Sequence, residues 1–247
     1  IYVNTFELWA VLVRTIGAER AAYVPFAALA LGVASMGGWI VLRRKGAERD
    51  TFRIRPVLLV LGLALAVVGL ALTDPAYPAK RIHVPQYLLL ALVLRRALSD
   101  HVGGAVLTAA TILVTLIFGI HDEMLQGLHP SRSYGLRDMA VNGVSGAAGA
   151  LLAAGIGLWT GPAVPFRPDR RTGAAAAALA CAVLFLVLHL VDHRGTPPPV
   201  WLGLPVVATG LALLAAGRAA AASPAVRHAA TAFAWITLPL ALYPVMP

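Results

Sequence analysis

One short stretch of the chain, HDEMLQGLHPSRSYGLRD at residues 121–138, gathers ionisable side chains within a sequence that is otherwise mostly apolar. It holds three carboxylates, two histidines and two arginines. Two neighbouring carboxylates can share a proton, a histidine can act as a base, and an arginine can hold a phosphate or a carboxylate. This stretch is therefore the first candidate for chemistry.

Polar residues at helical spacing extend the candidate site into three segments of the chain. Residues three or four positions apart lie on one face of a helix. The pairs with this spacing are His83 with Tyr87, Glu123 with Gln126, and Asp138 with Asn142. The loop between the second and third pairs is short and rich in turn residues, so its Arg132 can reach the carboxylates. We predict that these seven residues form one ligand-binding site.

The rest of the chain predicts membrane spans. Of its 247 residues 59% are hydrophobic and 13% are charged, and a helix needs about 20 apolar residues to cross a bilayer. No stretch shows the polar–apolar alternation of barrel strands, so we predict an all-α polytopic transmembrane helix bundle of about eight spans. The expected spans are 22–42, 56–73, 83–99, 103–121, 138–160, 173–192, 200–217 and 229–246, the last interrupted by Pro239 and Pro244.

Three parts follow from these spans. Residues 1–55 hold an N-terminal interfacial helix, indicated by Glu7 and Arg14 among apolar residues, and the first span. Residues 56–160 hold four spans and 161–247 hold three. Small residues such as Gly146 and Gly149 predict close approach between helices.

The basic residues predict the orientation. Thirteen of the 20 Lys and Arg residues fall on one side of the predicted spans and five on the other, which makes the first side cytoplasmic. The candidate site then faces outward. Topology and anionic lipid account for the net charge of +9, so we expect the lipid bilayer as partner and no nucleic acid.

No metal is predicted at the site, and no cofactor can be assigned. The single cysteine, Cys181, excludes an intramolecular disulfide and a multi-cysteine metal site. His189 and His193, four apart beside Asp192, could hold a transition metal or a pigment, or could be interface residues that donate hydrogen bonds to neighbouring helices. Both interpretations stay open.

The candidate site also fits a structural role. Asp138 could cap a helix, Asn142 could bond a neighbouring helix, and Glu123 could form an ion pair with Arg132. As a catalytic set, Glu123 and Asp138 would be a carboxylate pair with His83 as base, but no nucleophile motif accompanies them. Whether the chain is an enzyme is therefore open.

Taken in order, these residues resemble the VanZ-like membrane proteins. In that family a Lys and a His, then a Tyr, precede Glu-x-x-Gln, Pro-x-Arg and Asp-x-x-x-Asn, and the similarity covers roughly residues 56–160. Ser145 stands where the family usually has Gly, and the leading span and three trailing spans lie outside the family core. The matching residues are Lys80, His83, Tyr87, Glu123, Gln126, Pro130, Arg132, Asp138 and Asn142.

The resemblance implies a cell-surface role, since the namesake is associated with resistance to the antibiotic teicoplanin through reduced binding at the cell surface. We expect an integral protein of the bacterial cytoplasmic membrane whose periplasmic site binds, or also modifies, a cell-wall or lipid component of the envelope. The alternative is an accessory structural subunit that packs through its helices against protein partners in a larger membrane complex, respiratory or photosynthetic. The spans outside the family core favour such a docking role.

Overall fold

The computed structural model of the chain describes residues 5–45, 54–128, 135–162, 167–193, 198–219 and 224–246, and these ranges contain helices and no strand. The predicted all-α class is confirmed. The helices in chain order are α1 (Thr5–Ile16), α2 (Ala18–Ala21), α3 (Val24–Lys45), α4 (Pro56–Leu72), η2 (Pro78–Ile82), α5 (His83–Leu98), α6 (Gly104–Gly127), α7 (Leu136–Gly155), α8 (Arg170–Asp192), η3 (Val200–Gly203), α9 (Leu204–Ala219), α10 (Pro224–Thr237) and η4 (Leu238–Val245).

Several helices can cross a membrane by length and composition, which indicates a multi-pass membrane protein. The five that qualify are Ala18–Arg43, Gly104–Gly127, Arg170–Asp192, Val200–Arg218 and Pro224–Val245. The predicted number of eight is not confirmed, because α4 has only 17 residues, α5 has 16, and α7 carries Asp138 and Asn142 among several glycines. Two of these three helices, α5 and α7, carry candidate site residues, and the polar side chains lower the hydropathy of α7.

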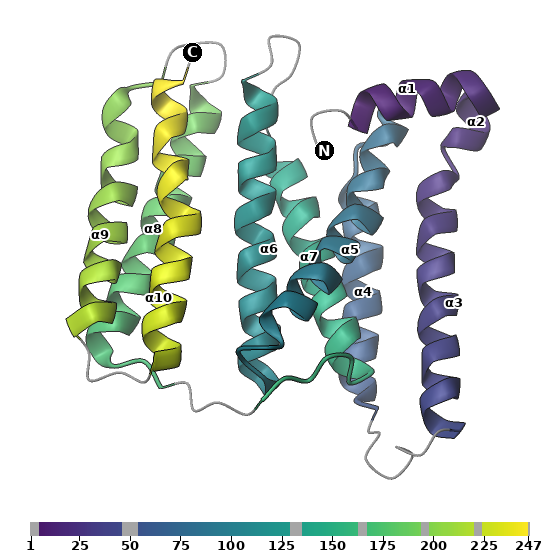
Figure 1. Cartoon of the computed structure of the whole chain (residues 1–247). Coiled ribbons are helices and arrows are strands. Elements are labelled where there is room, and N and C mark those ends of the chain that lie inside the picture. Colours follow the sequence, from purple (N-terminus) through teal and green to yellow (C-terminus); the bar gives the residue numbers. More distant parts are fainter. Residues whose placement is uncertain are drawn as a thin grey trace. The chain divides into compact units, whose positions relative to one another are not determined.

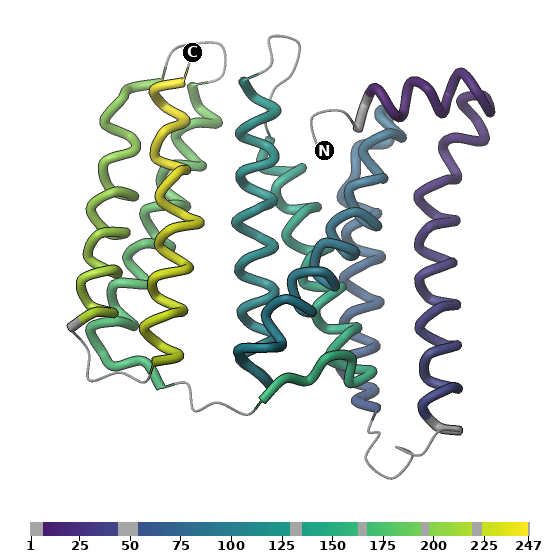
Figure 2. Tube along the Cα trace, in the orientation of Figure 1, coloured from purple at the N-terminus to yellow at the C-terminus, as the bar shows by residue number. Residues whose placement is uncertain are grey.

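The chain divides into two compact units, which are described separately. Unit 1 comprises Ile1–Gly119 and Arg137–Gly161, and unit 2 comprises Ile120–Leu136 and Pro162–Pro247. Unit 1 therefore contains α1 to α5, most of α6, and α7. Within it α5 runs obliquely to α4, as the trace in Figure 2 shows.

Helix α7 is the core of unit 1, because thirteen of its 20 residues are buried. Its small residues allow three neighbours to approach closely. A Cβ atom on Gly149 would lie 2.6 Å from the carbonyl oxygen of Leu88 in α5, and one on Gly146 would lie 2.3 Å from Cγ2 of Thr115 in α6. On the third side, Gly62 of α4 gives room to Leu152. The predicted role of Gly146 and Gly149 is confirmed.

The first helix runs across the direction of α3 (Figure 1). Gly17, with φ of 87°, makes the turn between α1 and α2, a backbone conformation that glycine adopts without steric cost. A helix lying across the end of a span is the arrangement expected at a membrane surface. The interfacial location itself stays a prediction.

In unit 2, α9 packs against both α8 and α10 (Figure 1). Helix α8 begins at the cap residue Asp169, whose carboxylate accepts a hydrogen bond from the backbone N–H of Thr172 at 2.7 Å. The predicted interruption at Pro239 is present, since α10 ends at Thr237 and continues as the 3₁₀ helix η4. Pro239 lacks the N–H that a regular helix would need there.

Candidate functional site

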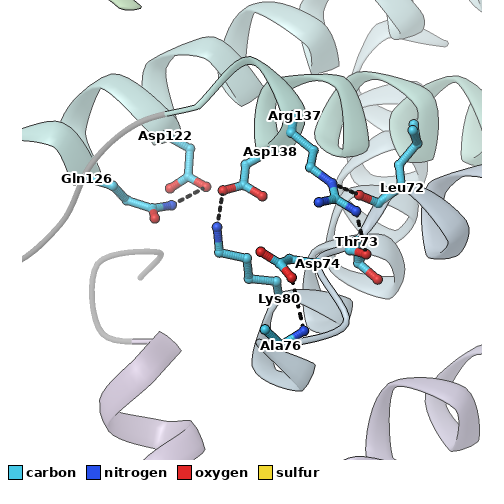
Figure 3. Close-up of polar contacts among 9 residues, drawn as sticks. All are labelled: Leu72, Thr73, Asp74, Ala76, Lys80, Asp122, Gln126, Arg137 and Asp138. Carbon is cyan, nitrogen blue, oxygen red and sulfur yellow. Dashed lines mark hydrogen bonds and ion pairs between the residues drawn. The ribbon is translucent and has the colours of Figure 1, made fainter. Parts of the chain in front are cut away.

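The predicted site residue Asp138 forms an ion pair at the start of α7. Its Oδ2 atom lies 2.5 Å from Nζ of Lys80, which belongs to η2 directly before α5 (Figure 3). The Lys80 side chain is 27% exposed and that of Asp138 is 11% exposed. This pair links η2 to the start of α7 and neutralises a mostly buried carboxylate.

The neighbouring residue Arg137 binds the end of α4. Its Nε donates to the carbonyl of Leu72 and its Nη2 donates to the carbonyl of Thr73 at 3.0 Å. These carbonyls belong to the last turn and cap of α4, where intrahelical N–H partners run out. Arg137 and Asp138 therefore hold both ends of the connection from α4 to α5, as Figure 3 shows.

Tyr87 and Asn142 meet at Gly119 in the interior of unit 1. Both are fully buried. A Cβ atom on Gly119 would lie 2.9 Å from Cβ of Asn142 and 3.4 Å from Cε1 of Tyr87. The Asn142 side-chain amide donates to the Gly119 carbonyl over a long 3.5 Å. The absence of a side chain at Gly119 thus lets α5, α6 and α7 bring these two polar residues together.

His83 lies one turn before Tyr87 on α5 and is also buried. The two rings are roughly parallel, with centroids 6.3 Å apart and an interplanar angle of 27°. The predicted shared face of His83 and Tyr87 is therefore present. The structure places four of the predicted site residues in unit 1: His83, Tyr87, Asp138 and Asn142.

Two further predicted residues, Glu123 and Gln126, lie on the last turns of α6 and belong to unit 2. Glu123 is 1% exposed and Gln126 is buried. The amide of Gln126 donates to Oδ2 of Asp122 at 3.2 Å, one turn earlier (Figure 3). The seventh predicted residue, Arg132, lies outside the described residues, as do His129 and Pro130 and, among the basic residues that predict orientation, Arg49, Arg53 and Arg194.

Sequence reasoning missed the roles of three polar residues. Lys80 belongs to the family-like motif but was not predicted to bind Asp138, because a contact between residues 58 positions apart has no local signal. Ser145 continues the Asp138–Asn142 face of α7, and its hydroxyl has no hydrogen-bond partner among the described residues. Asp122 precedes Gln126 by four positions, and that spacing was the available signal.

His121 links the end of α6 to α10 and η4 in unit 2. Its Nε2 donates to the carbonyl of Ile236 at 2.8 Å, and its Nδ1 lies 3.3 Å from the hydroxyl of Tyr243. In a 3₁₀ pattern the Ile236 carbonyl would accept from residue 239, which is proline and has no N–H. His121 supplies the missing donor, so its role in the structure is to join α6 to the break between α10 and η4.

His189 and His193 each bind their own helix. Nδ1 of His189 donates to the carbonyl of Phe185 at 2.9 Å, and Nδ1 of His193 donates to the carbonyl of His189 at 2.8 Å. Because the two rings make the same contact one turn apart, their Nε2 atoms are separated by about 6 Å along the axis. Nitrogens that share one ion lie at most about 4 Å apart, twice a Zn–N bond. A shared metal would therefore require one ring to turn.

The grouped residues of unit 1 can recognise a charged ligand by exchange of the ion pair and by hydrogen bonds from amide, imidazole and phenol groups. A reaction through a covalent intermediate would need a nucleophile activated by a base. Ser145 does not meet that requirement, since its hydroxyl has no such base among the described residues. The contacts of the described residues support binding of a ligand.

Comparisons with protein-family models, with curated proteins and with solved structures give no match to this chain. The resemblance to the VanZ-like proteins therefore stays a prediction based on the residues of the motif. The same holds for the family's site, because no relative assigns a role to any of these side chains.

Proposed function

We propose that this chain is a VanZ-like protein of the bacterial cytoplasmic membrane whose polar site, facing outward, binds a lipid or cell-wall component of the envelope. The observation that supports the proposal is the grouping at one end of unit 1 of the Lys80–Asp138 ion pair with buried His83, Tyr87 and Asn142. Ionisable groups near hydrocarbon are costly, and proteins keep them there mostly for function.

The orientation rests on the distribution of basic residues. The cytoplasmic side is assigned the basic residues at the end of α3 and after it and those at the start of α8, and the opposite side is assigned Lys80 and Arg137. Both of these are bound within the chain, Lys80 by Asp138 and Arg137 by the carbonyls of α4. Lys80 and Arg137 therefore contribute to the structure of the site as well as to the proposed charge of the outer side.

The proposal is tested by extracting the protein from its native membrane in polymer nanodiscs and identifying the lipids and envelope components that remain bound. Asp138→Asn and His83→Gln are expected to lose a component that the unaltered protein retains, at unchanged folded yield. Asp74→Asn is the matched control, because Asp74 lies at the same end and, among the described residues, its carboxylate accepts a hydrogen bond from the backbone N–H of Ala76 alone. An identical set of bound components in all four proteins would contradict the proposal.

A second candidate is favoured by α3. Only 6% of the apolar window in Ala18–Arg43 is buried within the chain, so this span has almost no intramolecular partner among the described residues. A subunit of a larger membrane complex would present such a helix to a neighbour. Stoichiometric partner proteins after extraction in mild detergent would support this candidate, and elution of the chain alone would exclude it.

A further inference from the structure

Lys80 places a primary ammonium group in the candidate site. Its Nζ atom lies 2.5 Å from Oδ2 of Asp138 and 5.8 Å from the centroid of the Tyr77 ring. A carboxylate and the face of an aromatic ring are the groups that proteins use to bind cationic ligands. Lys80 therefore occupies the position in which the ammonium group of a ligand would be held.

The two members of this pair differ in accessibility and in freedom to move. Lys80 is the more exposed of the two, so a ligand from solvent reaches it first. Lysine has a long flexible stem. Asp138 is fixed at the start of a buried helix, next to Arg137 with its two bonds to α4. A ligand ammonium that replaced Lys80 at Asp138 would thus move Lys80 and leave Asp138 in place.

Charge balance determines the other half of the ligand. A simple cation that displaced Lys80 from Asp138 would break the ion pair of Lys80 and bring a second positive charge beside it, which is unfavourable. A ligand that also carries an anion avoids this cost, because the anion can pair with the displaced Lys80. Among the described residues the other nearby cations are already engaged: Arg137 by two carbonyls, and Arg81 by the ring of Phe26 at 5.6 Å.

We propose that the site binds an ammonium–phosphate zwitterion of the ethanolamine-phosphate type, with the ammonium on Asp138 and the phosphate on Lys80. A primary ammonium is favoured over a quaternary one, because only the former donates the N–H hydrogen bond that Lys80 now gives to Asp138. This assignment rests on the proposed function, since it names the ligand class of the same site. A lipid headgroup and soluble phosphoethanolamine share this chemistry.

The test measures the affinity of the detergent-solubilised protein, by native mass spectrometry, for phosphatidylethanolamine, phosphatidylcholine, phosphatidylglycerol and soluble phosphoethanolamine. Phosphatidylethanolamine is expected to bind more tightly than the other two lipids by about tenfold or more, the effect of one charge-assisted hydrogen bond. Asp138→Asn should remove this preference, because Asp138 holds the ammonium. Lys80→Met should keep it, because the phosphate that Lys80 would bind is common to all three lipids, and Asp74→Asn should keep it as well. Equal binding of the lipids, tightest binding of phosphatidylglycerol, or a preference that survives Asp138→Asn would overturn the assignment.

The soluble arm identifies the source of the headgroup. If phosphoethanolamine binds as tightly as the lipid, the site recognises the zwitterion alone. If it binds much more weakly while the lipid preference holds, the acyl chains contribute and the source is the membrane. The extraction experiment separates the two proposals. If Asp138→Asn loses a native envelope component that has no ammonium group, the zwitterion assignment is wrong but the proposed function stands.

A second measurement keeps the proposal falsifiable if Lys80→Met folds poorly. Lys80→Ala leaves Asp138 with space for an added cation, so ethylamine is expected to raise the thermal unfolding midpoint of this variant. The same addition should leave the Lys80→Ala, Asp138→Asn double variant unchanged. No rise in Lys80→Ala, or an equal rise in both variants, would show that Asp138 does not hold a ligand ammonium.

Discussion

Gly146 of α7 lies directly against Thr115 of α6: a Cβ atom on Gly146 would be 2.3 Å from Cγ2 of Thr115. Thr115 cannot easily move, because it is fully buried and its hydroxyl donates to the carbonyl of Thr111 at 2.7 Å. We predict that Gly146→Ala lowers the free energy of unfolding by about 1–3 kcal/mol, the usual cost of overpacking. Unfolding of the detergent-solubilised protein measures this.

Gly32 of α3 is the matched control, since a Cβ atom there would meet nothing within 4 Å. Gly32→Ala should be neutral or stabilising, because alanine favours the helix over glycine by about 1 kcal/mol. Equal effects of the two substitutions would show that α6 and α7 are not packed as closely as described.

A second prediction concerns Arg95, a buried cation near the end of α5. Its Nε donates to the carbonyl of Leu158 at 2.8 Å and its Nη1 donates to the hydroxyl of Thr108 at 3.2 Å. Arg95→Met leaves the Leu158 carbonyl without this donor, so we expect a loss of about 1–3 kcal/mol in unfolding free energy. The adjacent Arg96 forms an exposed pair with Asp100, and Arg96→Met should cost roughly 0.5 kcal/mol or less. A smaller effect at Arg95 than at Arg96 would contradict the assigned bonds.

The helical class and much of the unit 1 site were predictable from local spacing. His83 with Tyr87, and Asp138 with Asn142, stand at helical intervals, and the structure brings all four into unit 1. What sequence could not supply was the partner of Asp138. Several cations were available in nearby loops, and only the fold of the α4–α5 connection selects Lys80 for Asp138 and gives Arg137 to α4.

The number of spans was harder to predict for a related reason. Hydropathy counts every polar residue against a helix, so α7 falls short because it carries Asp138, Asn142 and Ser145, all of them buried. The close approach at Gly146 and Gly149 was predictable, because glycine in an apolar helix has few other purposes. Whether Glu123 and Gln126 act with the unit 1 residues stays a prediction.

A third prediction tests the donor role of His121. His121→Phe removes the hydrogen bond to the Ile236 carbonyl, and an unsatisfied buried carbonyl costs about 1–3 kcal/mol. Pro239→Ala restores a backbone N–H in the same turn. The double variant should therefore lose less stability than the sum of the two single variants. Strict additivity would show that Pro239 is not the reason why this carbonyl needs His121.

A fourth prediction concerns pH and Asp169, which lies outside the membrane-spanning part of α8. The hydrogen bond from the backbone N–H of Thr172 lowers the pKa of Asp169 below its ordinary value of 3.8. A carboxyl group whose pKa falls on folding stabilises the folded state above its unfolded-state pKa, and this contribution is lost as the pH falls through the folded-state pKa. The stability difference between the unaltered protein and Asp169→Ala should thus shrink in acid.

Asp169→Asn distinguishes the effect of the carboxylate charge from that of the capping hydrogen bond, because asparagine also accepts a hydrogen bond at this position. Thermal unfolding midpoints of the three proteins, taken at neutral pH and below pH 3.8, provide the comparison. Asp169→Asn should stay capped at both pH values. A stability gap between Asp169→Ala and the unaltered protein that does not depend on pH would refute the role of the carboxylate charge.

The proposed binding site is tested most directly by an experimental density map of the protein in nanodiscs of its native membrane. Density for a polar headgroup or sugar is expected in contact with Lys80 and Asp138, with Lys80 moved from its present 2.5 Å contact. An intact Lys80–Asp138 pair covered only by solvent and acyl chains would contradict the proposed function.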